Sequence, residues 1–362
     1  MRLRVFVILF FTCLSEAIAE VSLIAVGDIM PATLTQKGYL PDSKLLFVDA
    51  KQEFEKVDFV LGNLETTLAD TGVPRQPERE YIFLTPIRYA PSLKDAGFDF
   101  LSLANNHTYD FGKEGLQSTM SVLEANGIAY SGIKWQEPYV VLHNEQGKKI
   151  AVCAFGFNFY CNQLNKPQEV VRIVQLAKSA ADIVVVTFHG GGEGKEYRNL
   201  PVGGEKYLGE DRGSLREFAH LCIDTGADFV FGHGPHVVRA IELYKGRLIA
   251  YSLGNFCTPY GVSIQGISGY APILKVVLAD DGHLLEGRII SMVQKRGYGP
   301  RYDQSGIVID EIRHLSDDNI AGTLNITSTG HIVASEYATD ANTEEIEEKY
   351  DSTEIDWSNK GW

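Results

Sequence analysis

Side chains that can bind metal ions follow five apolar segments of this chain, at the point where each segment ends. They are Asp28, Glu65, Asn106 with His107, His189, and His233 with His236. In open α/β sheets the carboxyl ends of the strands border the crevice where ligands bind, so these groups are expected to converge. Carboxylate, amide and imidazole donors together suit Mn²⁺, Zn²⁺ or Fe, as one ion or as two bridged by carboxylates.

Two roles are expected within this set. The predicted metal ligands are Asp28, Glu65, Asn106, His189, His233 and His236. His107 would act as a general acid on the substrate side, with Asp110 three residues later orienting its ring. Glu193 follows His189 after three glycines and would contact the substrate or act as a base.

Each of these residues also has a simpler structural interpretation. Asp28 can cap a helix or a turn, and Asn106 suits a turn because Asn tolerates left-handed backbone. His189 can be a hydrogen-bonded core histidine, and Pro235 can fix a rigid turn between the last two histidines. Five such coincidences at successive strand ends favour one shared site over separate structural roles.

The elements that would position these residues alternate along the chain. Strands are predicted at 21–27, 58–63, 99–106, 148–157, 182–190 and 228–234, and helices at 44–57, 87–98, 113–127, 167–181 and 214–227. Strands alternating with helices of this length imply parallel strands joined by helical crossovers.

The second half of the chain has a different pattern. Residues 237–256 and 271–293 each have the pattern of a hairpin, turning at Lys245-Gly246 and at Asp281-Gly282. Antiparallel pairs beside a parallel sheet predict a mixed α/β chain, a two-sheet sandwich with helices outside. Residues 71–80 form a polar loop, and because no stretch resembles an interdomain linker, one domain is expected over residues 20–335.

The two ends of the chain are expected to lie outside this domain. Residues 1–19 have the features of a signal peptide: two early arginines, an apolar run and a small-residue cleavage site before Glu20. Residues 336–362 are expected to form an acidic, flexible tail. We therefore expect an exported protein, periplasmic or extracellular, that is soluble or peripheral to the membrane.

Charge and cysteine content narrow the partners and the redox chemistry. The formal net charge of −14 argues against nucleic acid, which requires a basic face. Cys153 and Cys222 lie in apolar runs and are expected in the core. Cys161 and Cys257 follow Phe-rich segments at predicted strand ends, so an oxidising compartment would allow a disulfide between them, with free thiols as the alternative.

The order of motifs resembles the bacterial capsule synthesis protein CapA family. The resemblance rests on "AVGDIM", "GNLETTL", "SLANNHTYDFG", "HGGGE" and "GHGPHVVRAIELYKGRLIAYSLGNF", and it runs from about residue 21 to residue 258, more weakly to about 335. It implies a metallophosphoesterase-like, calcineurin-like fold, a four-layer αββα sandwich of two mixed sheets. It also implies a part in capsule or poly-γ-glutamate production.

Matched to metallophosphoesterases, the chain keeps most of the metal motif and departs from it in two places. Asp28, Glu65, Asn106 with His107, His189, and His233 with His236 fall at or near motif positions. Met30 stands where the first-strand histidine would be, which removes one ligand of one ion. The last histidine pair has one extra residue between its members, as in the CapA family.

Two functional hypotheses follow. The first is a metal-dependent hydrolase that cleaves a phosphoester or an amide of a cell-surface polymer. The second is a non-catalytic assembly or export factor for an anionic polymer, working with a membrane-bound capsule synthase complex, in which a bound cation attracts the polymer. A metal-free remnant of the fold is the remaining alternative.

Overall fold

The computed structural model describes residues 20–35, 39–259 and 262–334. The predicted signal peptide at 1–19 and acidic tail at 336–362 lie outside the described residues. Within those ranges, no helix has both the length and the apolar character needed to cross a bilayer.

The first sheet is built around β1 (Glu20–Ile29). On one side of β1 the strands are parallel, in the order β2 (Phe59–Leu64), β5 (Phe100–Ser102) and β6 (Ala129–Ser131). On the other side they are antiparallel, in the order β16 (Ile273–Ala279), β17 (Leu284–Ile290), β21 (His331–Ala334) and β20 (Leu324–Ile326). β15 (Asn255–Cys257) pairs with the carboxyl end of β1.

The second sheet has a parallel centre and two antiparallel edges. Its order is β13 (Ile241–Tyr244), β14 (Arg247–Ala250), β12 (Phe229–His233), β9 (Ile183–His189), β8 (Lys149–Gly156) and β7 (Tyr139–His143). The strands from β14 to β8 are parallel, and β13 and β7 run antiparallel to their neighbours. Both sheets are therefore mixed.

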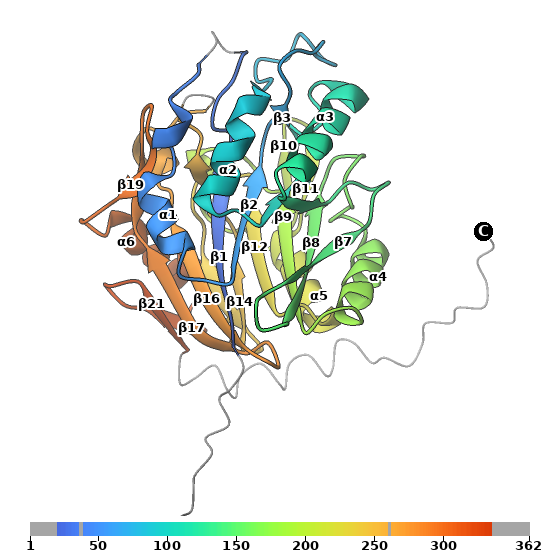
Figure 1. The fold of residues 1–362 in the computed structure, drawn as a ribbon. Coiled ribbons are helices and arrows are strands. Elements are labelled where there is room, and N and C mark those ends of the chain that lie inside the picture. Colours follow the sequence, from blue (N-terminus) through green and yellow to red (C-terminus); the bar gives the residue numbers. More distant parts are fainter. Residues whose placement is uncertain (1–19, 36–38, 260–261, 335–362) are drawn as a thin grey trace, which may run out of the picture.

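Helices cover the outer faces of both sheets and give the four layers of an αββα sandwich (Figure 1). The first sheet carries α1 (Val48–Phe54), α2 (Ala90–Ala96) and α3 (Gly112–Ala125), and the second carries α4 (Pro167–Lys178) and α5 (Leu215–Thr225). α6 (Ile307–Asn319) contacts both β13 and β20. The predicted fold class is confirmed.

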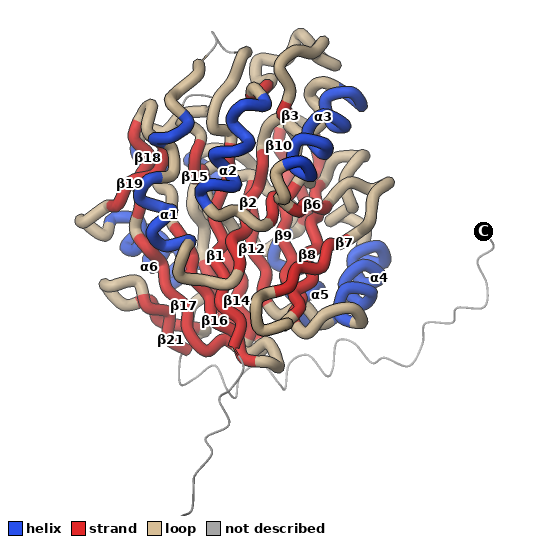
Figure 2. Tube along the Cα trace, viewed as in Figure 1, coloured by secondary structure: helices blue, strands red, loops and turns tan. Residues whose placement is uncertain are grey.

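Shorter elements complete the described fold (Figure 2). Paired strands are β3 (Thr67–Leu68) with β4 (Leu84–Thr85), β10 (Glu205–Tyr207) with β11 (Glu210–Gly213), and β18 (Met292–Lys295) with β19 (Gly299–Tyr302). Short 3-10 turns are η1 (Ser43–Leu45), η2 (Ile87–Tyr89), η3 (Lys195–Tyr197) and η4 (Gly266–Gly269).

Alternation along the strands builds two apolar layers. In β12, Phe229 and Phe231 belong to the core between the sheets, whereas Val230 belongs to the core under α4 and α5. Successive side chains of a strand point to opposite faces, so a strand covered on both faces is apolar throughout. This explains why β12, and β9 apart from Thr187, stay apolar until each ends in a histidine.

The hairpins predicted from the sequence form where expected. β13 and β14 pair around Lys245 and Gly246, whose φ angles of 49° and 73° match the turn that suits a two-residue hairpin. β16 and β17 pair around Asp281-Gly282. The late helix α6 was not among the predicted elements.

The disulfide that the sequence allowed is not formed. Cys153, Cys161, Cys222 and Cys257 are all buried free thiols. Cys153 and Cys222 lie in the core, as predicted. Burial raises the pKa of the Cys161 and Cys257 thiols, because an apolar environment disfavours the charged thiolate.

A candidate metal centre

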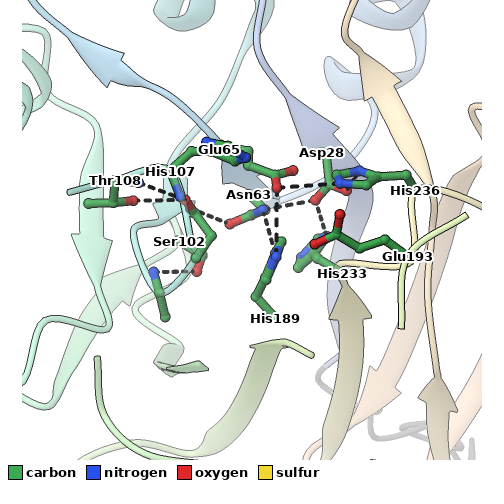
Figure 3. A network of polar contacts seen from close by, with 12 residues as sticks. Asp28, Asn63, Glu65, Ser102, His107, Thr108, His189, Glu193, His233 and His236 are labelled. Carbon is green, nitrogen blue, oxygen red and sulfur yellow. Dashed lines mark hydrogen bonds and ion pairs between the residues drawn. The ribbon is translucent and has the colours of Figure 1, made fainter. Parts of the chain in front are cut away.

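The carboxyl ends of strands from both sheets meet at one place (Figure 3). In the first sheet, Asp28 of β1 is the register partner of Asn63 in β2, and Glu65 follows two residues later. In the second sheet, His189 at the end of β9 is the register partner of His233 at the end of β12. Parallel pairing thus places carboxylates along one edge and imidazoles along the facing edge.

Each carboxylate of this cluster contacts two imidazoles. An oxygen of Asp28 lies 3.4 Å from His233 Nδ1, and the other lies 3.2 Å from His236 Nδ1. Glu65 Oε1 lies 3.6 Å from His189 Nε2 and 3.7 Å from His236 Nε2. Ligand atoms of Asp28, Glu65 and His189 all lie within 4.8 Å of one another.

The segment between the last two histidines is held in a strained conformation. His236 has a φ of 57°, which a residue with a side chain seldom adopts, and Gly234 has a φ of 115°. A Cβ on Gly234 would come within 2.6 Å of the Gly190 carbonyl oxygen. The Gly190 N–H donates to the His233 carbonyl at 3.0 Å. This docking onto the 190–193 loop directs both imidazoles toward Asp28.

Several ligand atoms of the cluster are buried and have no hydrogen-bond partner among the described residues. They are Asp28 Oδ2, Glu65 Oε1, His189 Nε2 and His233 Nδ1. Buried polar atoms are normally satisfied, and each unsatisfied one costs about 1–3 kcal/mol. Oxygen and imidazole nitrogen atoms left unsatisfied around one point match the needs of a divalent cation. The residues present therefore fit a metal ion.

The pKa shifts in the cluster also indicate that it needs a positive charge. Burial and the Asp28 charge raise the pKa of Glu65 well above its usual range. Burial opposes ionisation of Asp28 too, but the charges of the neighbouring imidazoles, His236 foremost, outweigh it and lower the pKa of Asp28. Burial lowers the pKa of His236, yet the two carboxylates raise it to about 10. The proton on His236 thus supplies the positive charge that a cation would supply.

The other two imidazoles favour the neutral form. Burial lowers the pKa of His189 well below its usual range and the pKa of His233 to about 4. Metal ions bind the neutral form of imidazole, so this burial prepares both rings as ligands.

The predicted acid and its partner form a pair beside the cluster. His107 Nδ1 lies 2.8 Å from Asp110 Oδ2, and the Phe83 N–H donates to the same oxygen at 2.9 Å. The Phe83 ring packs against His107 with 4.4 Å between ring centroids. Asp110 therefore holds the His107 ring in place, and the acid role of this histidine stays a prediction.

Of the two remaining predicted site residues, Glu193 lies at the cluster and Asn106 lines a cavity next to it. Glu193 lies at the cluster (Figure 3), where its Oε1 accepts from Arg212 Nη1 at 2.7 Å. Asn106 has no hydrogen bond to the cluster in the described part of the chain, and it lines an adjoining cavity. Its Oδ1 is buried without a partner. Its role as a metal ligand stays a prediction.

Several functional residues were missed by the sequence prediction. Asn63 Nδ2 donates to Asp28 Oδ1 at 2.8 Å and lies 3.4 Å from His189 Nδ1, so it touches both sheets. Asn255 Oδ1 lies 3.0 Å from His236 Nδ1, and Thr187 Oγ1 lies 3.0 Å from His233 Nε2. One available signal was the Gly-Asn pair after two apolar segments, because Asn63 and Asn255 flank Asp28 in the sheet.

The fold and the cluster together define an αββα protein with a candidate carboxylate–imidazole metal site. The family described as bacterial capsule synthesis protein PGA_cap matches residues 22–260, and the chain belongs to this family.

Curated relatives carry names from the same field. The chain is 32% identical over 254 residues to the PGA biosynthesis protein CapA of Bacillus subtilis (strain 168), covering 65% of this chain and 63% of that protein. It is 29% identical over 223 residues to the capsule biosynthesis protein CapA of Bacillus anthracis, covering 56% and 51%. The chain thus spans less than two thirds of the length of either relative.

Solved structures with a similar arrangement include two nucleotidases. The NAD nucleotidase of Haemophilus influenzae aligns at 11% identity with a TM-score of 0.42, over 83% of this chain and 56% of that one. A 5'-nucleotidase precursor from Thermus thermophilus aligns at 11% identity with a TM-score of 0.44, over 84% and 60%. These scores are too low to indicate a shared activity.

Proposed function

We infer that this chain is an exported, metal-dependent hydrolase that acts on a phosphoester or amide bond of an anionic cell-surface polymer. The observation that carries this proposal is the set of unsatisfied ligand atoms from Asp28, Glu65, His189 and His233 at the meeting edges of the two sheets. The His107–Asp110 pair lies beside that set.

The proposed ligands are Asp28, Glu65, His189, His233 and His236, holding one or two ions of Mn²⁺, Zn²⁺ or Fe. When bound, such an ion supplies Lewis acidity and stabilises negative charge that develops on a substrate oxygen. Met30 takes the sequence position of the first-strand histidine of metallophosphoesterases, so we expect one ion to bind more tightly than a second.

The proton-transfer residues of the proposal lie on the substrate side. Asp110 holds the ring proton on His107 Nδ1, which leaves Nε2 as the atom that exchanges a proton with the leaving group. Glu193 is fixed by Arg212 at the edge of the cluster, where it would orient the substrate or accept a proton.

The second candidate is a non-catalytic factor for assembly or export of the polymer, working with a membrane-bound synthase complex. Two observations favour it. Met30 removes an imidazole from the phosphoesterase pattern, and a relative from Mycobacterium tuberculosis, 28% identical over 243 residues, is named a probable polyglutamine synthesis accessory protein.

Metal content and turnover separate the two candidates. We expect the purified mature protein to carry transition metal and to hydrolyse a chromogenic phosphodiester or a γ-glutamyl amide, with chelator abolishing turnover. His107→Ala should lower turnover by about 100-fold while metal content stays near wild type, because general acid catalysis contributes that much. His314→Ala, an exposed histidine on α6, is the matched control.

Two results would count against this assignment. Metal-loaded protein that hydrolyses neither substrate favours the assembly factor. Equal loss of metal and turnover in His107→Ala would show that His107 supports the metal site rather than transferring a proton.

A further inference from the structure

The β10–β11 hairpin belongs to neither of the two large sheets, yet it contacts two loops that carry residues of the cluster. One loop is residues 190–194, which follow β9 and include Glu193. The other is residues 234–240, which follow β12 and include His236. The hairpin is therefore placed to fix how the two loops lie against each other.

The contact with the second loop is a buried ion pair. Arg239 Nη1 and Nη2 donate to Glu205 Oε1 and Oε2 at 2.7 and 2.8 Å. Arg239 Nε donates to the Tyr197 carbonyl at 2.8 Å. Both charged side chains are buried. Two parallel hydrogen bonds between a guanidinium and a carboxylate fix their relative orientation as well as their distance, so Arg239 has one defined position.

The same carboxylate holds the first loop. Glu205 Oε2 accepts the Gly192 N–H at 2.9 Å. The Tyr197 ring lies so close to Gly192 that a Cβ there would come within 2.1 Å of it. From the other strand of the hairpin, the Arg212 carbonyl accepts the Gly191 N–H at 2.8 Å. Glu205 thus joins the loop that carries Glu193 to the segment that carries His236.

The conformation of His236 requires support of this kind. Its φ of 57° is unfavourable for a residue with a side chain, and such residues persist where the surrounding contacts over-determine them. Before His236, the Pro235 carbonyl accepts the Gly194 N–H at 2.9 Å. After it, Arg239 is held by Glu205 through its side chain and by the Ser252 carbonyl, at 3.0 Å, through its backbone N–H. The chain is therefore fixed on both sides of the strained residue.

Stability alone does not explain an ion pair at this place. Burying two charges removes both from water, and apolar residues of similar volume often stabilise a fold equally well or better. What the ion pair offers instead is direction, because its hydrogen bonds are made in one geometry only. A directional contact is useful next to a cluster whose ligand atoms must converge on one point.

We propose that Glu205 and Arg239 are positioning residues for the cluster, which hold the His236 segment against the 190–194 loop. Neither side chain makes a hydrogen bond or ion pair with Asp28, Glu65 or a cluster histidine among the described residues, so both act through the two loops. This inference rests on the metal site of the proposed function and adds the residues that fix its geometry.

Histidine ring signals in nitrogen-15 NMR test the inference on the chelator-treated mature protein, at one fixed pH. Glu205→Leu/Arg239→Met removes both charges together, so that neither is left buried and unpaired. We expect the His236 ring signals, assigned by their loss in His236→Asn, to shift in this double variant. Lys178→Met is the matched control, because it breaks an ion pair with Asp228 at the opposite end of β12, and it should leave these signals unchanged.

Metal affinity gives a second measurement on the same variants. Residues that orient metal ligands typically contribute about 10–100-fold to affinity, so the double variant should lose that much in a chelator competition. Arg239→Lys keeps the charge without the paired geometry and should lose less. Unchanged His236 signals in the double variant overturn the proposal. If the double variant does not fold, Arg239→Lys decides by the same signals.

Hydrolysis is measured separately, on metal-loaded wild type. Shifted His236 signals in the double variant, with no turnover by wild type, support the positioning role and reject the hydrolase. Turnover by wild type, with unchanged His236 signals in the double variant, rejects the positioning role and leaves the hydrolase standing.

Discussion

The two sheets contribute opposite chemistry to the cluster. The first sheet supplies the carboxylates of Asp28 and Glu65, and the second supplies the imidazoles of His189, His233 and His236. Within each sheet, parallel pairing sets the spacing of the neighbouring residues. Neither sheet alone has both kinds of ligand, so the candidate site forms only when the sheets pack.

This division has an energetic consequence. Carboxylates grouped in one sheet repel each other, and buried neutral imidazoles grouped in the other resist protonation. Packing brings each carboxylate within 4 Å of two imidazoles and offsets part of both costs. A cation would offset the remainder, because it binds the ligand atoms that stay unsatisfied.

The largest expected effect comes from removing one ligand in each sheet. Asp28→Ala and His189→Ala should each weaken metal binding by at least about 1,000-fold, because a closed site loses one of few ligands. Metal content after dialysis and a competition titration with a chelator measure the loss. Asp317→Ala, an exposed acid on α6, is the control. If Asp28→Ala keeps the metal and His189→Ala loses it, the imidazoles of the second sheet hold the ion without the Asp28 carboxylate. The conclusion that both sheets are needed would then be wrong.

The second prediction concerns how the stability of the metal-free protein depends on pH through a histidine of the second sheet. Burial lowers the pKa of His233 to about 4, against 6.5 in the unfolded chain. Above pH 6.5 the ring is neutral in both states, and below it only the unfolded chain takes up the proton. Stability is therefore lost as pH falls from 6.5 to 4, by about 3 kcal/mol.

Denaturant unfolding of chelator-treated protein at a series of pH values measures that loss. His233→Asn should reduce the loss of stability between pH 6.5 and 4 relative to wild type, whereas the exposed control His314→Ala should not. If His233→Asn loses as much stability on acidification as wild type, another group is responsible for the pH dependence.

A third effect concerns the residue that joins the sheets. Asn63 bonds Asp28 and lies beside His189, so Asn63→Leu should weaken metal binding by about 10–100-fold while every ligand remains. The exposed Asn325 of β20, changed to Ala, is the control. Metal affinity unchanged in Asn63→Leu would show that the sheets hold their ligands independently.

The sequence was informative where a residue's role follows from its place at a strand end. Asp28, His189 and His233 could be predicted because each ends an apolar run in a chain whose strands are parallel. Asn63 and Thr187 could not, because their roles depend on which side chains the opposite sheet or the neighbouring strand presents. Glu205 could not be predicted either, because its partner Arg239 lies 34 residues away in the chain.

The smallest expected effect lies within the second sheet alone. Thr187 Oγ1 hydrogen-bonds His233 Nε2 at 3.0 Å, and this bond orients the ring so that Nδ1 faces Asp28. Thr187→Val keeps the shape of the side chain and removes the hydroxyl, so metal binding should weaken by about fivefold, or about 1 kcal/mol. Thr187→Ser keeps the hydroxyl and should stay near wild type in the same chelator competition. A loss as large as that of Asn63→Leu would mean that ring orientation within one sheet matters as much as the bridge between the sheets.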